Sequence, residues 1–525
     1  MSVDRRDLVV VLVLALGSLA VFLTYWDYGL NDDEGYLLGG VTRILDGQVP
    51  YRDFHHTYGP ARFYLVAFLF RLFGEDLLVL RGLWLVMRVV VVVLAYLSGR
   101  RFLSRPGAVA AALFFMAAPG PWHKSFFHLF LLANLFVLGG LRGKGARGVA
   151  TAGFLAGVTF LFRQDLGIFV GVSYGALLVL GRWTGESPKR AALFSLSALL
   201  AVLPVVIYFT AEGALGAAAS KVLLAGATDN RANALPFPPL FHPVSGGPAG
   251  AAFLGLRLLY YVPLPLYVVA GVAGLLGLLR RGEGAALFLA ALLGAASFNQ
   301  AVWRSDLAHL LQALACCWLL LPWGAERLRR WSAGLALGAA FALPALIFLQ
   351  TLVYARTYES PIGPALIASE GLQPIPPYYL GSVSQLRGGT VRLPIRRARV
   401  RMAPDEAAYL RAIQSAIDRY SKPGDYMVTV PGFQLLYFLF DRANPTAYVH
   451  VRRAFDSPEE EERYARDILE KPTKIVLLRD TPLDGRNERR FSRFAPNAYA
   501  AIERGFEPVE EFGNLVIYRR KEAGL

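Results

Sequence analysis

Residues 77–98 read LLVLRGLWLVMRVVVVVLAYLS, a run in which Arg81 and Arg88 are the only charged residues. About 20 consecutive apolar residues are enough for a helix to cross the hydrocarbon core of a bilayer. The run therefore predicts a transmembrane helix. Arg88 lies near its middle, where a cation in lipid is costly and usually faces a cavity or a partner.

Ten further apolar segments surround this one, which gives about eleven expected spans. The chain of 525 residues is 55% hydrophobic and 18% charged, too apolar for an ordinary soluble protein. Its net charge of +15 would suggest nucleic acid as a partner, but many of the Lys and Arg residues sit in short connectors, so nucleic-acid binding is set aside. The other segments are 8–26, 106–121, 125–141, 147–163, 165–182, 191–210, 254–279, 284–302, 306–323 and 332–353.

Basic residues occupy every second connector, as the positive-inside rule requires of cytoplasmic loops. Arg5 and Arg6 precede the first segment, and no small-residue cleavage site follows it, so an uncleaved first helix with a cytoplasmic N-terminus is expected. An odd number of spans then leaves the C-terminal region outside. The connector residues are Arg100, Arg101, Arg105, Arg142, Lys144, Arg147, Arg182, Lys189, Arg190, Arg280, Arg281, Arg327, Arg329 and Arg330.

The C-terminal part of the chain has a mixed, polar composition. We expect a linker over 354–400 and a soluble α/β domain over 401–525. Expected elements are helices over 405–420 and from Ser457-Pro458, strands over 426–430 and 474–478, and a hairpin at Gly513-Asn514. No catalytic motif is found there. The two cysteines, Cys316 and Cys317, lie in an apolar segment and are expected to pack between helices.

The first outer loop, residues 27–76, begins with the acidic stretch Asn31-Asp32-Asp33-Glu34-Gly35-Tyr36, followed by apolar residues at helical spacing. The pattern predicts an amphipathic interfacial helix. Asn31 and Glu34 would form a capping box there, and acids suit the first turn of a helix. Alternatively, a carboxylate just outside the first span serves as a general base or holds a divalent cation.

The loop continues as Asp-Gly-Gln-Val-Pro-Tyr-Arg-Asp-Phe (46–54), and a second amphipathic run ends at Phe73. Together these features resemble the first exoplasmic loop of GT-C glycosyltransferases, especially bacterial members allied to protein O-mannosyltransferases and lipid A aminoarabinose transferases. The resemblance implies a GT-C fold of about eleven transmembrane helices over 1–353, with a C-terminal α/β exoplasmic domain. In these families an Asp of an Asp-Glu pair is the proposed catalytic base, which corresponds to Asp33 and Glu34. Asp32 is an additional acid, and Glu34 or Asp32 would position the acceptor or a metal ion.

The resemblance also implies a cavity lined by polar residues from several segments. Snorkelling and helix-end anchoring remain alternatives for the arginines, capping for Lys124, and a structural ion pair for Arg88. The same helix face carries Asp306 and His309, three residues apart. Expected donor-phosphate ligands are Arg81, Arg88, Arg163, Arg304 and Lys124, and expected cavity residues are His55, His56, Tyr58, Gln164, Asp165, Asp306 and His309.

The activity implied is inverting transfer of a sugar from a polyprenyl phosphate to a hydroxyl of a glycan, lipid or protein on the outer face of a bacterial cytoplasmic membrane. Expected partners are the donor, the acceptor and membrane lipids. No cofactor is certain; a divalent cation, if present, would sit on the three acids. The alternatives are a transporter or flippase of lipid-linked sugars, although no internal repeat is visible, and a nonenzymatic subunit of envelope assembly.

Overall fold

A computed structural model describes residues 4–141, 144–180, 187–224, 234–328, 333–360, 362–374, 389–451, 455, 457–483 and 486–522. Part of the expected linker, residues 375–388, lies outside the described residues. So do four residues of the basic connectors, Arg142, Arg182, Arg329 and Arg330. The chain divides into two compact units. The bundle unit comprises residues 1–26, 81–208 and 234–384, and the mixed unit comprises residues 27–80, 209–233 and 385–525.

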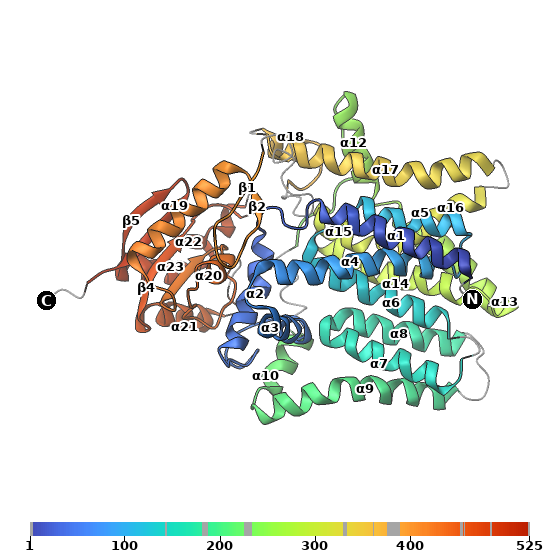
Figure 1. Cartoon of the computed structure of the whole chain (residues 1–525), viewed down its shortest axis with the longest axis horizontal. Coiled ribbons are helices and arrows are strands. Elements are labelled where there is room, and N and C mark those ends of the chain that lie inside the picture. Colours follow the sequence, from blue (N-terminus) through green and yellow to red (C-terminus); the bar gives the residue numbers. More distant parts are fainter. Residues whose placement is uncertain are drawn as a thin grey trace. The chain divides into compact units, whose positions relative to one another are not determined.

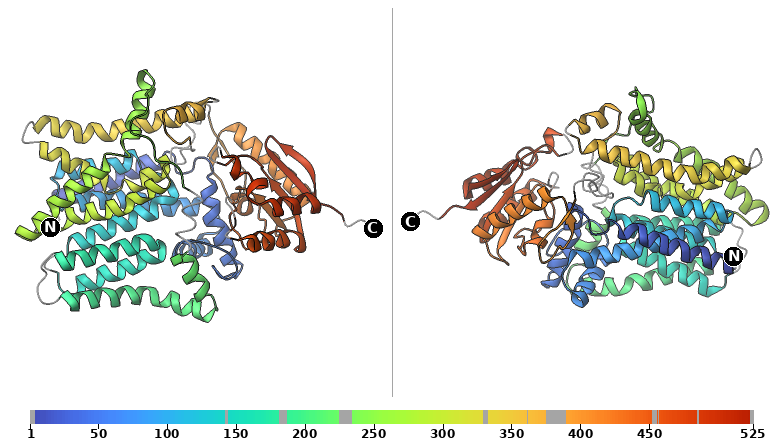
Figure 2. Two further views of the ribbon diagram at one scale, coloured as in Figure 1. Left: turned by 180° about the vertical axis from the view of Figure 1, so that it is seen from behind. Right: turned by 45° about the horizontal axis from the view of Figure 1, so that its top comes forward.

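Long helices make up the bundle unit, and they run side by side in Figures 1 and 2. Helix α13 packs on α14, α7 on α8, and α5 on both α16 and α17. The helices are α1 (Arg5–Leu23), α4 (Leu77–Gly99), α5 (Arg105–Ala117), η1 (Trp122–Lys124), α6 (Ser125–Gly139), α7 (Ala146–Phe162), α8 (Gln164–Leu180), α9 (Ser187–Ala211), α12 (Gly247–Leu258), α13 (Pro263–Arg281), α14 (Ala285–Trp303), α15 (Leu307–Ala313), α16 (Cys317–Leu328), α17 (Ala333–Tyr358) and α18 (Gly363–Ser369).

Each of the apolar segments expected to span the membrane is helical over most of its length. By length and composition, five helices of the described chain can cross a membrane, or six if α15 and α16 are one bent span. Shorter apolar helices such as α5, α7 and α8 accompany them. The chain is thus a multi-pass membrane protein, and the number of eleven spans stays a prediction.

Two expected continuous spans are interrupted. Segment 254–279 consists of α12 and α13, separated by residues 259–262. Pro263 and Pro265 lack the backbone N–H that would continue the hydrogen bonds of a preceding helix. Both residues fit the first turn of the following helix, α13. Segment 306–323 is likewise divided into α15 and α16, which are bent by 62°.

The mixed unit combines helices with a small sheet. Its four-stranded sheet has the order β3-β4-β6-β5, with β3 and β4 parallel and the other pairs antiparallel, and β1 and β2 form a separate antiparallel pair. Its elements are α2 (Asp32–Leu45), α3 (Ala61–Phe73), α10 (Leu215–Ala219), η2 (Ser220–Leu224), β1 (Val391–Arg392), β2 (Arg401–Met402), α19 (Pro404–Tyr420), β3 (Tyr426–Val430), α20 (Leu435–Leu439), α21 (Pro458–Glu470), β4 (Thr473–Leu478), η4 (Asn487–Arg489), α22 (Phe491–Phe494), α23 (Pro496–Gly505), β5 (Phe506–Phe512) and β6 (Leu515–Arg520).

Local signals in the C-terminal sequence match these elements. Ser457 caps α21 with Pro458 in its first turn, and Gly513, at a φ of 60°, lies in the turn between β5 and β6. Both faces of β4 are buried: Val476 packs in one core with Val428 of β3, Ile502 of α23 and one face of α21, while Leu477 and its partner Ile517 are buried on the opposite face. The α/β character predicted for this region is confirmed.

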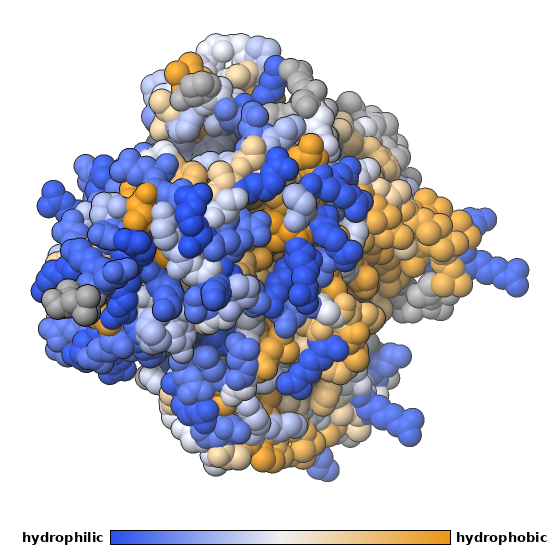
Figure 3. All heavy atoms as spheres, turned by 60° about the vertical axis from the view of Figure 1, so that its left-hand side comes forward, coloured by the Kyte–Doolittle hydropathy of each residue, from blue (hydrophilic) through white to orange (hydrophobic). Residues whose placement is uncertain are grey.

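The two units differ in the chemistry of their surfaces. Large apolar side chains are exposed along α1, α9 and α13, for example Val13, Leu199 and Val268. Hydrophilic residues cover the mixed unit in Figure 3, and apolar residues cover the sides of the bundle helices. A broad apolar surface on helices of this length is expected of a protein surrounded by lipid.

Candidate functional site

The acidic stretch begins helix α2 of the mixed unit, as the sequence predicts. Asn31 accepts a hydrogen bond from the N–H of Asp33, and the Glu34 carboxylate accepts one from the N–H of Asn31 at 3.2 Å. This is the expected capping box. Glu34 is buried, with 1% of its surface exposed, whereas Asp32 and Asp33 are partly exposed.

Asp32 contacts the C-terminal part of the same unit. One of its carboxylate oxygens accepts a hydrogen bond from the main-chain N–H of Phe433 at 3.1 Å. Phe433 belongs to the turn between β3 and α20. The three acids therefore have different surroundings, although they are adjacent in sequence.

Histidine and tyrosine side chains gather beside α2 in the mixed unit. The ring of His56 stacks on that of Tyr36 at 4.5 Å between centroids. The ring of His450 packs edge-on against Tyr36 at 5.2 Å. Arg62 lies 3.0 Å from Nε2 of His56. Gln434, from the turn that holds Phe433, lies 2.7 Å from Nδ1 of His450.

Two other expected cavity residues lie in this group. The guanidinium of Arg62 covers the ring of Tyr58 at 4.5 Å, and His55 packs against Tyr448 at 4.7 Å. Burial, with the nearby charge of Arg62, holds the pKa of His56 well below its ordinary value of 6.5. His56 is therefore neutral at pH 7 and has a structural place in this cluster.

In the bundle unit, two polar stretches that are far apart in the sequence meet. Arg163 at the end of α7 donates two hydrogen bonds to Asp165 at 2.8 and 3.1 Å. The amide of Gln300, in the last turn of α14, donates to the same carboxylate at 3.1 Å. Gln164 is buried beside them.

Arg304 follows that turn of α14 and begins the second polar stretch. Its Nε donates to Asp306 at 2.8 Å, and the other oxygen of Asp306 lies 2.8 Å from Nδ1 of His309 and accepts the N–H of that residue. Asp306 is 2% exposed and caps α15. The charged groups of this cluster thus form two ion pairs, Arg163–Asp165 and Arg304–Asp306, with His309 on the second carboxylate.

Arg81 and Arg88 lie on one face of α4 and contact the end of α1. Arg81 donates to the carbonyl of Trp26 at 3.3 Å, and Arg88 donates to the hydroxyl of Tyr25 at 3.3 Å. Arg88 also donates to the carbonyl of Gly120 at 2.5 Å and lies 3.5 Å from the centre of a Trp122 ring.

Arg88 is 3% exposed, and no carboxylate among the described residues forms a salt bridge with it. Its positive charge is stabilised by carbonyl and hydroxyl oxygens and by the face of an indole, which is worth about 2 kcal/mol when water is excluded. The structural ion pair that was the alternative role for Arg88 is thus not observed among the described residues. A neighbouring histidine, His128, lies within reach of the charges of Arg88 and Lys124.

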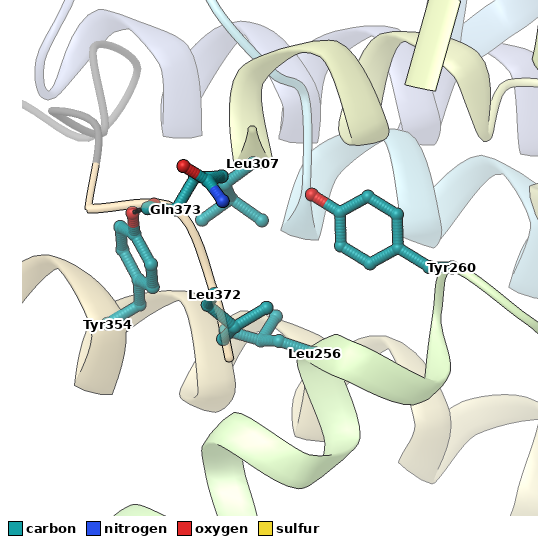
Figure 4. Close-up of a pocket in the computed structure, with 6 residues that line it drawn as sticks. All are labelled: Leu256, Tyr260, Leu307, Tyr354, Leu372 and Gln373. Carbon is teal, nitrogen blue, oxygen red and sulfur yellow. Dashed lines mark hydrogen bonds between the residues drawn. The ribbon is translucent and has the colours of Figure 1, made fainter. Parts of the chain in front are cut away.

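A small pocket lies next to the Asp306 cluster. Figure 4 shows two tyrosines and three leucines around it, and the hydroxyl of Tyr354 donates to the carbonyl of Gln373 at 2.6 Å. Leu307, the residue after Asp306, forms part of its wall. The lining residues are Leu256, Tyr260, Leu307, Tyr354, Leu372 and Gln373.

Several residues of these clusters were not expected from the sequence. Gln300 is a polar residue near the end of an apolar helix, and that position was its only signal. Arg62, Gln434 and His450 carry no local motif at all. Among the described residues, no group of three or more His, Cys, Asp or Glu side chains is arranged to hold a metal ion, and the cation expected on the acids stays a prediction.

Comparison with known proteins defines the fold. No family model matches the chain, and no curated protein matches its sequence. Among solved structures, the chain is similar to apo ArnT from Cupriavidus metallidurans, with 13% identity and a TM-score of 0.53 over 98% of this chain and 96% of that chain. ArnT from the same organism bound to undecaprenyl phosphate gives 14% identity and a TM-score of 0.52 over 98% of both chains. The predicted GT-C fold is confirmed.

Proposed function

We propose that this chain is a membrane glycosyltransferase that moves a sugar from a polyprenyl phosphate carrier to an acceptor hydroxyl. The similarity to ArnT over nearly the whole of both chains carries the proposal, since one of those structures holds undecaprenyl phosphate. The reaction needs a base and cations for the phosphate; the acids of α2 and the arginines of the bundle unit are groups of these two kinds.

Asp33 is the proposed general base. Glu34 is buried in the capping box, whereas Asp32 and Asp33 are both partly exposed in the first turn of α2. Of these two, Asp33 is the one that adjoins Glu34 and so matches the Asp-Glu pair. The N-terminus of a helix stabilises the ionised form of a carboxylate, which is the form that accepts a proton. The side chain would take the proton of the acceptor hydroxyl.

The reaction is then a single displacement. The acceptor oxygen forms a bond to the anomeric carbon while the bond between that carbon and the phosphate oxygen breaks, and the electron pair of that bond leaves with the polyprenyl phosphate. Attack opposite the leaving group inverts the anomeric configuration. The proton goes to Asp33, and no nucleotide is consumed.

Cations of the bundle unit would stabilise the departing phosphate. Arg88 has a permanent charge and, among the residues that the structure describes, no carboxylate partner; arginine also presents forked donors that match phosphate oxygens. Arg304 and Arg163 are held in fixed orientations by Asp306 and Asp165. Stabilisation of charge that develops in the transition state is often the largest catalytic contribution.

The basic connectors orient the proposed reaction. A cytoplasmic N-terminus puts the first loop and residues 401–525 on the outer face, in a bacterium the periplasmic face of the cytoplasmic membrane. The acceptor is then a glycan, a lipid or a protein on that face. Sugars that reach it on a lipid carrier need no soluble donor there.

The test is transfer of radiolabelled sugar from a panel of polyprenyl-phosphate sugars, in membranes that contain equal amounts of each protein. Wild type should transfer label to an acceptor, and Asp33→Asn should not. Asp46→Asn is the matched control, because Asp46 is an exposed acid at the other end of α2. Label that crosses the bilayer on an intact carrier, with no transfer from any donor, would identify a transporter instead.

A further inference from the structure

Contacts within the mixed unit connect the acidic end of α2 to the region that follows residue 388. We propose that this C-terminal region positions α2 for catalysis and that Asp32 is a positioning residue, anchored by the turn after β3. The inference rests on the proposed function, because it assigns a role in that reaction.

The anchor is the N–H of Phe433, which donates to Asp32 at 3.1 Å. Its turn is unusual, since Gly432 and Phe433 have φ values of 87° and 59°. A phenylalanine in the left-handed region is strained, so the surrounding contacts must hold it there. The guanidinium of Arg479 covers the Phe433 ring at 4.5 Å, which helps to fix the turn. A constrained turn thus aims a backbone donor at one acid.

Helix α2 also touches this region through its backbone. A Cβ atom on Gly35 would lie 2.2 Å from the nitrogen and 2.5 Å from the Cα of Leu435, so only glycine fits there. One turn later, a Cβ on Gly39 would lie 2.9 Å from a methyl group of Val449. The face of α2 that follows the acids therefore lies directly on α20 and its neighbours.

Arg43 fixes the far end of the same helix. Its guanidinium donates to the carbonyls of Asn444 and Thr446 at 3.1 and 2.5 Å, and its side chain is buried. Both ends and one face of α2 are thus held by residues 433–449. Because Asp33 adjoins Asp32 on this helix, the placement of the proposed base depends on the same contacts.

The proposal separates acceptance of a hydrogen bond from acceptance of a proton. An asparagine at 32 can still accept the N–H of Phe433 but cannot serve as a base, and an alanine can do neither. Misplacement of a catalytic group by about 1 Å can cost about 100-fold in rate. We therefore expect Asp32→Ala to lower kcat by about 10- to 100-fold with little change in the KM for donor, and Asp32→Asn to restore most of that loss.

Rates of transfer in Asp32→Ala, Asp32→Asn and Asp33→Asn give the first readout. If Asp32→Asn is as inactive as Asp33→Asn, Asp32 takes part in the chemistry and the proposal is wrong. If Asp32→Ala transfers as fast as wild type, the anchor has no role in positioning.

Hydrogen exchange of the full-length protein gives a second readout that needs no activity. The amides of residues 432–436 should exchange faster in Asp32→Ala than in wild type, and Asp32→Asn should resemble wild type. Gly35→Ala should also speed exchange there, whereas Gly175→Ala, whose Cβ would meet open space on α8, should not. Unchanged exchange in Asp32→Ala and Gly35→Ala would overturn the anchor even if wild type proves inactive in transfer.

Discussion

Arg401 and Asp27 form an ion pair in which Nε donates to Oδ2 at 2.9 Å and Nη2 donates to Oδ1 at 2.5 Å. Two residues earlier, Arg399 meets Asp76 at 2.7 Å, and Arg397 meets Glu75 at 2.8 Å. Three arginines at alternate positions thus hold acids at the two ends of the first loop, 27–76. Arg397 and Arg399 lie at the end of the expected linker over 354–400, and Arg401 is the first residue of the expected C-terminal domain.

Reversal of the charge at position 401 should destabilise the protein. Arg401→Glu places two acids together and should lower stability by about 1–2 kcal/mol, more than the loss of an ordinary exposed pair. The double change Asp27→Arg with Arg401→Glu should recover part of that loss. Melting temperatures in detergent would measure both effects.

Arg519→Glu is the control for this comparison, because Arg519 and Glu507 form a pair whose side chains are 44% and 42% exposed. It should change stability by less than about 1 kcal/mol. Equal losses for Arg401→Glu and Arg519→Glu would show that the alternate arginines contribute no more than surface charges.

Acid should destabilise the mixed unit through His56. Its pKa in the folded protein lies well below 6.5, so below this pH the unfolded chain binds a proton that the folded protein does not. Stability therefore falls as the pH falls below 6.5, by at most about 1.4 kcal/mol per pH unit for one proton.

Melting temperatures of wild type and His56→Gln from pH 7.5 to 5 would test this dependence. The difference between the two proteins should shrink toward low pH, because glutamine does not titrate. His242→Gln, a half-buried histidine of the bundle unit, serves as the control. Parallel curves for wild type and His56→Gln would contradict the prediction.

Lysine should not replace Arg88. It keeps the charge but cannot donate at once to Gly120 and Tyr25 while stacking on Trp122, so Arg88→Lys should lower transfer at least about tenfold. The loss of a hydrogen bond from a charged donor should also cost about 1–3 kcal/mol in stability. Arg280→Lys, at an exposed position, should leave both unchanged. Normal transfer by Arg88→Lys would remove Arg88 from the donor site.

Gln300→Leu tests the bond that joins the two polar stretches of the bundle unit. Without the amide donor, the Asp165 carboxylate loses one of its partners, and transfer should fall about 3- to 10-fold, corresponding to about 1 kcal/mol. Asn299→Leu changes the neighbouring, exposed residue of α14 and should have little effect. Equal transfer by both variants would mean that the hydrogen bond from Gln300 to Asp165 does not contribute to transfer.

Local signals in the sequence predicted local structure well. The capping box at Asn31, the caps at Ser457 and the turn at Gly513 each depend on neighbouring residues, and hydrophobic length alone placed most helices. The prolines at 263 and 265, however, lie in a continuous apolar run. The break before α13 could be recognised only from the backbone of the structure. Apolar length cannot distinguish one span from two shorter helices.

Contacts between distant segments were beyond the reach of these signals. No residue near Asp32 in the sequence indicates that the N–H of Phe433 donates to it. Likewise, the sequence around Asp165 does not predict its hydrogen bond from Gln300. The sequence shows arginines at alternate positions over 397–401, but it does not indicate that Asp27 and Asp76 are their partners. The resemblance of the first loop predicted the fold correctly, whereas the roles of individual acids and arginines stay proposals.

Cleavage of the bond between sugar and carrier is the central claim, and release of polyprenyl phosphate by purified protein measures it most directly. The protein would be placed in lipid nanodiscs with a labelled polyprenyl-phosphate sugar and a periplasmic extract as the source of acceptor. Wild type should release one polyprenyl phosphate for each sugar transferred, and Asp33→Asn should release none. Release by Asp33→Asn at the wild-type rate, or an intact carrier with every donor tested, would contradict the account.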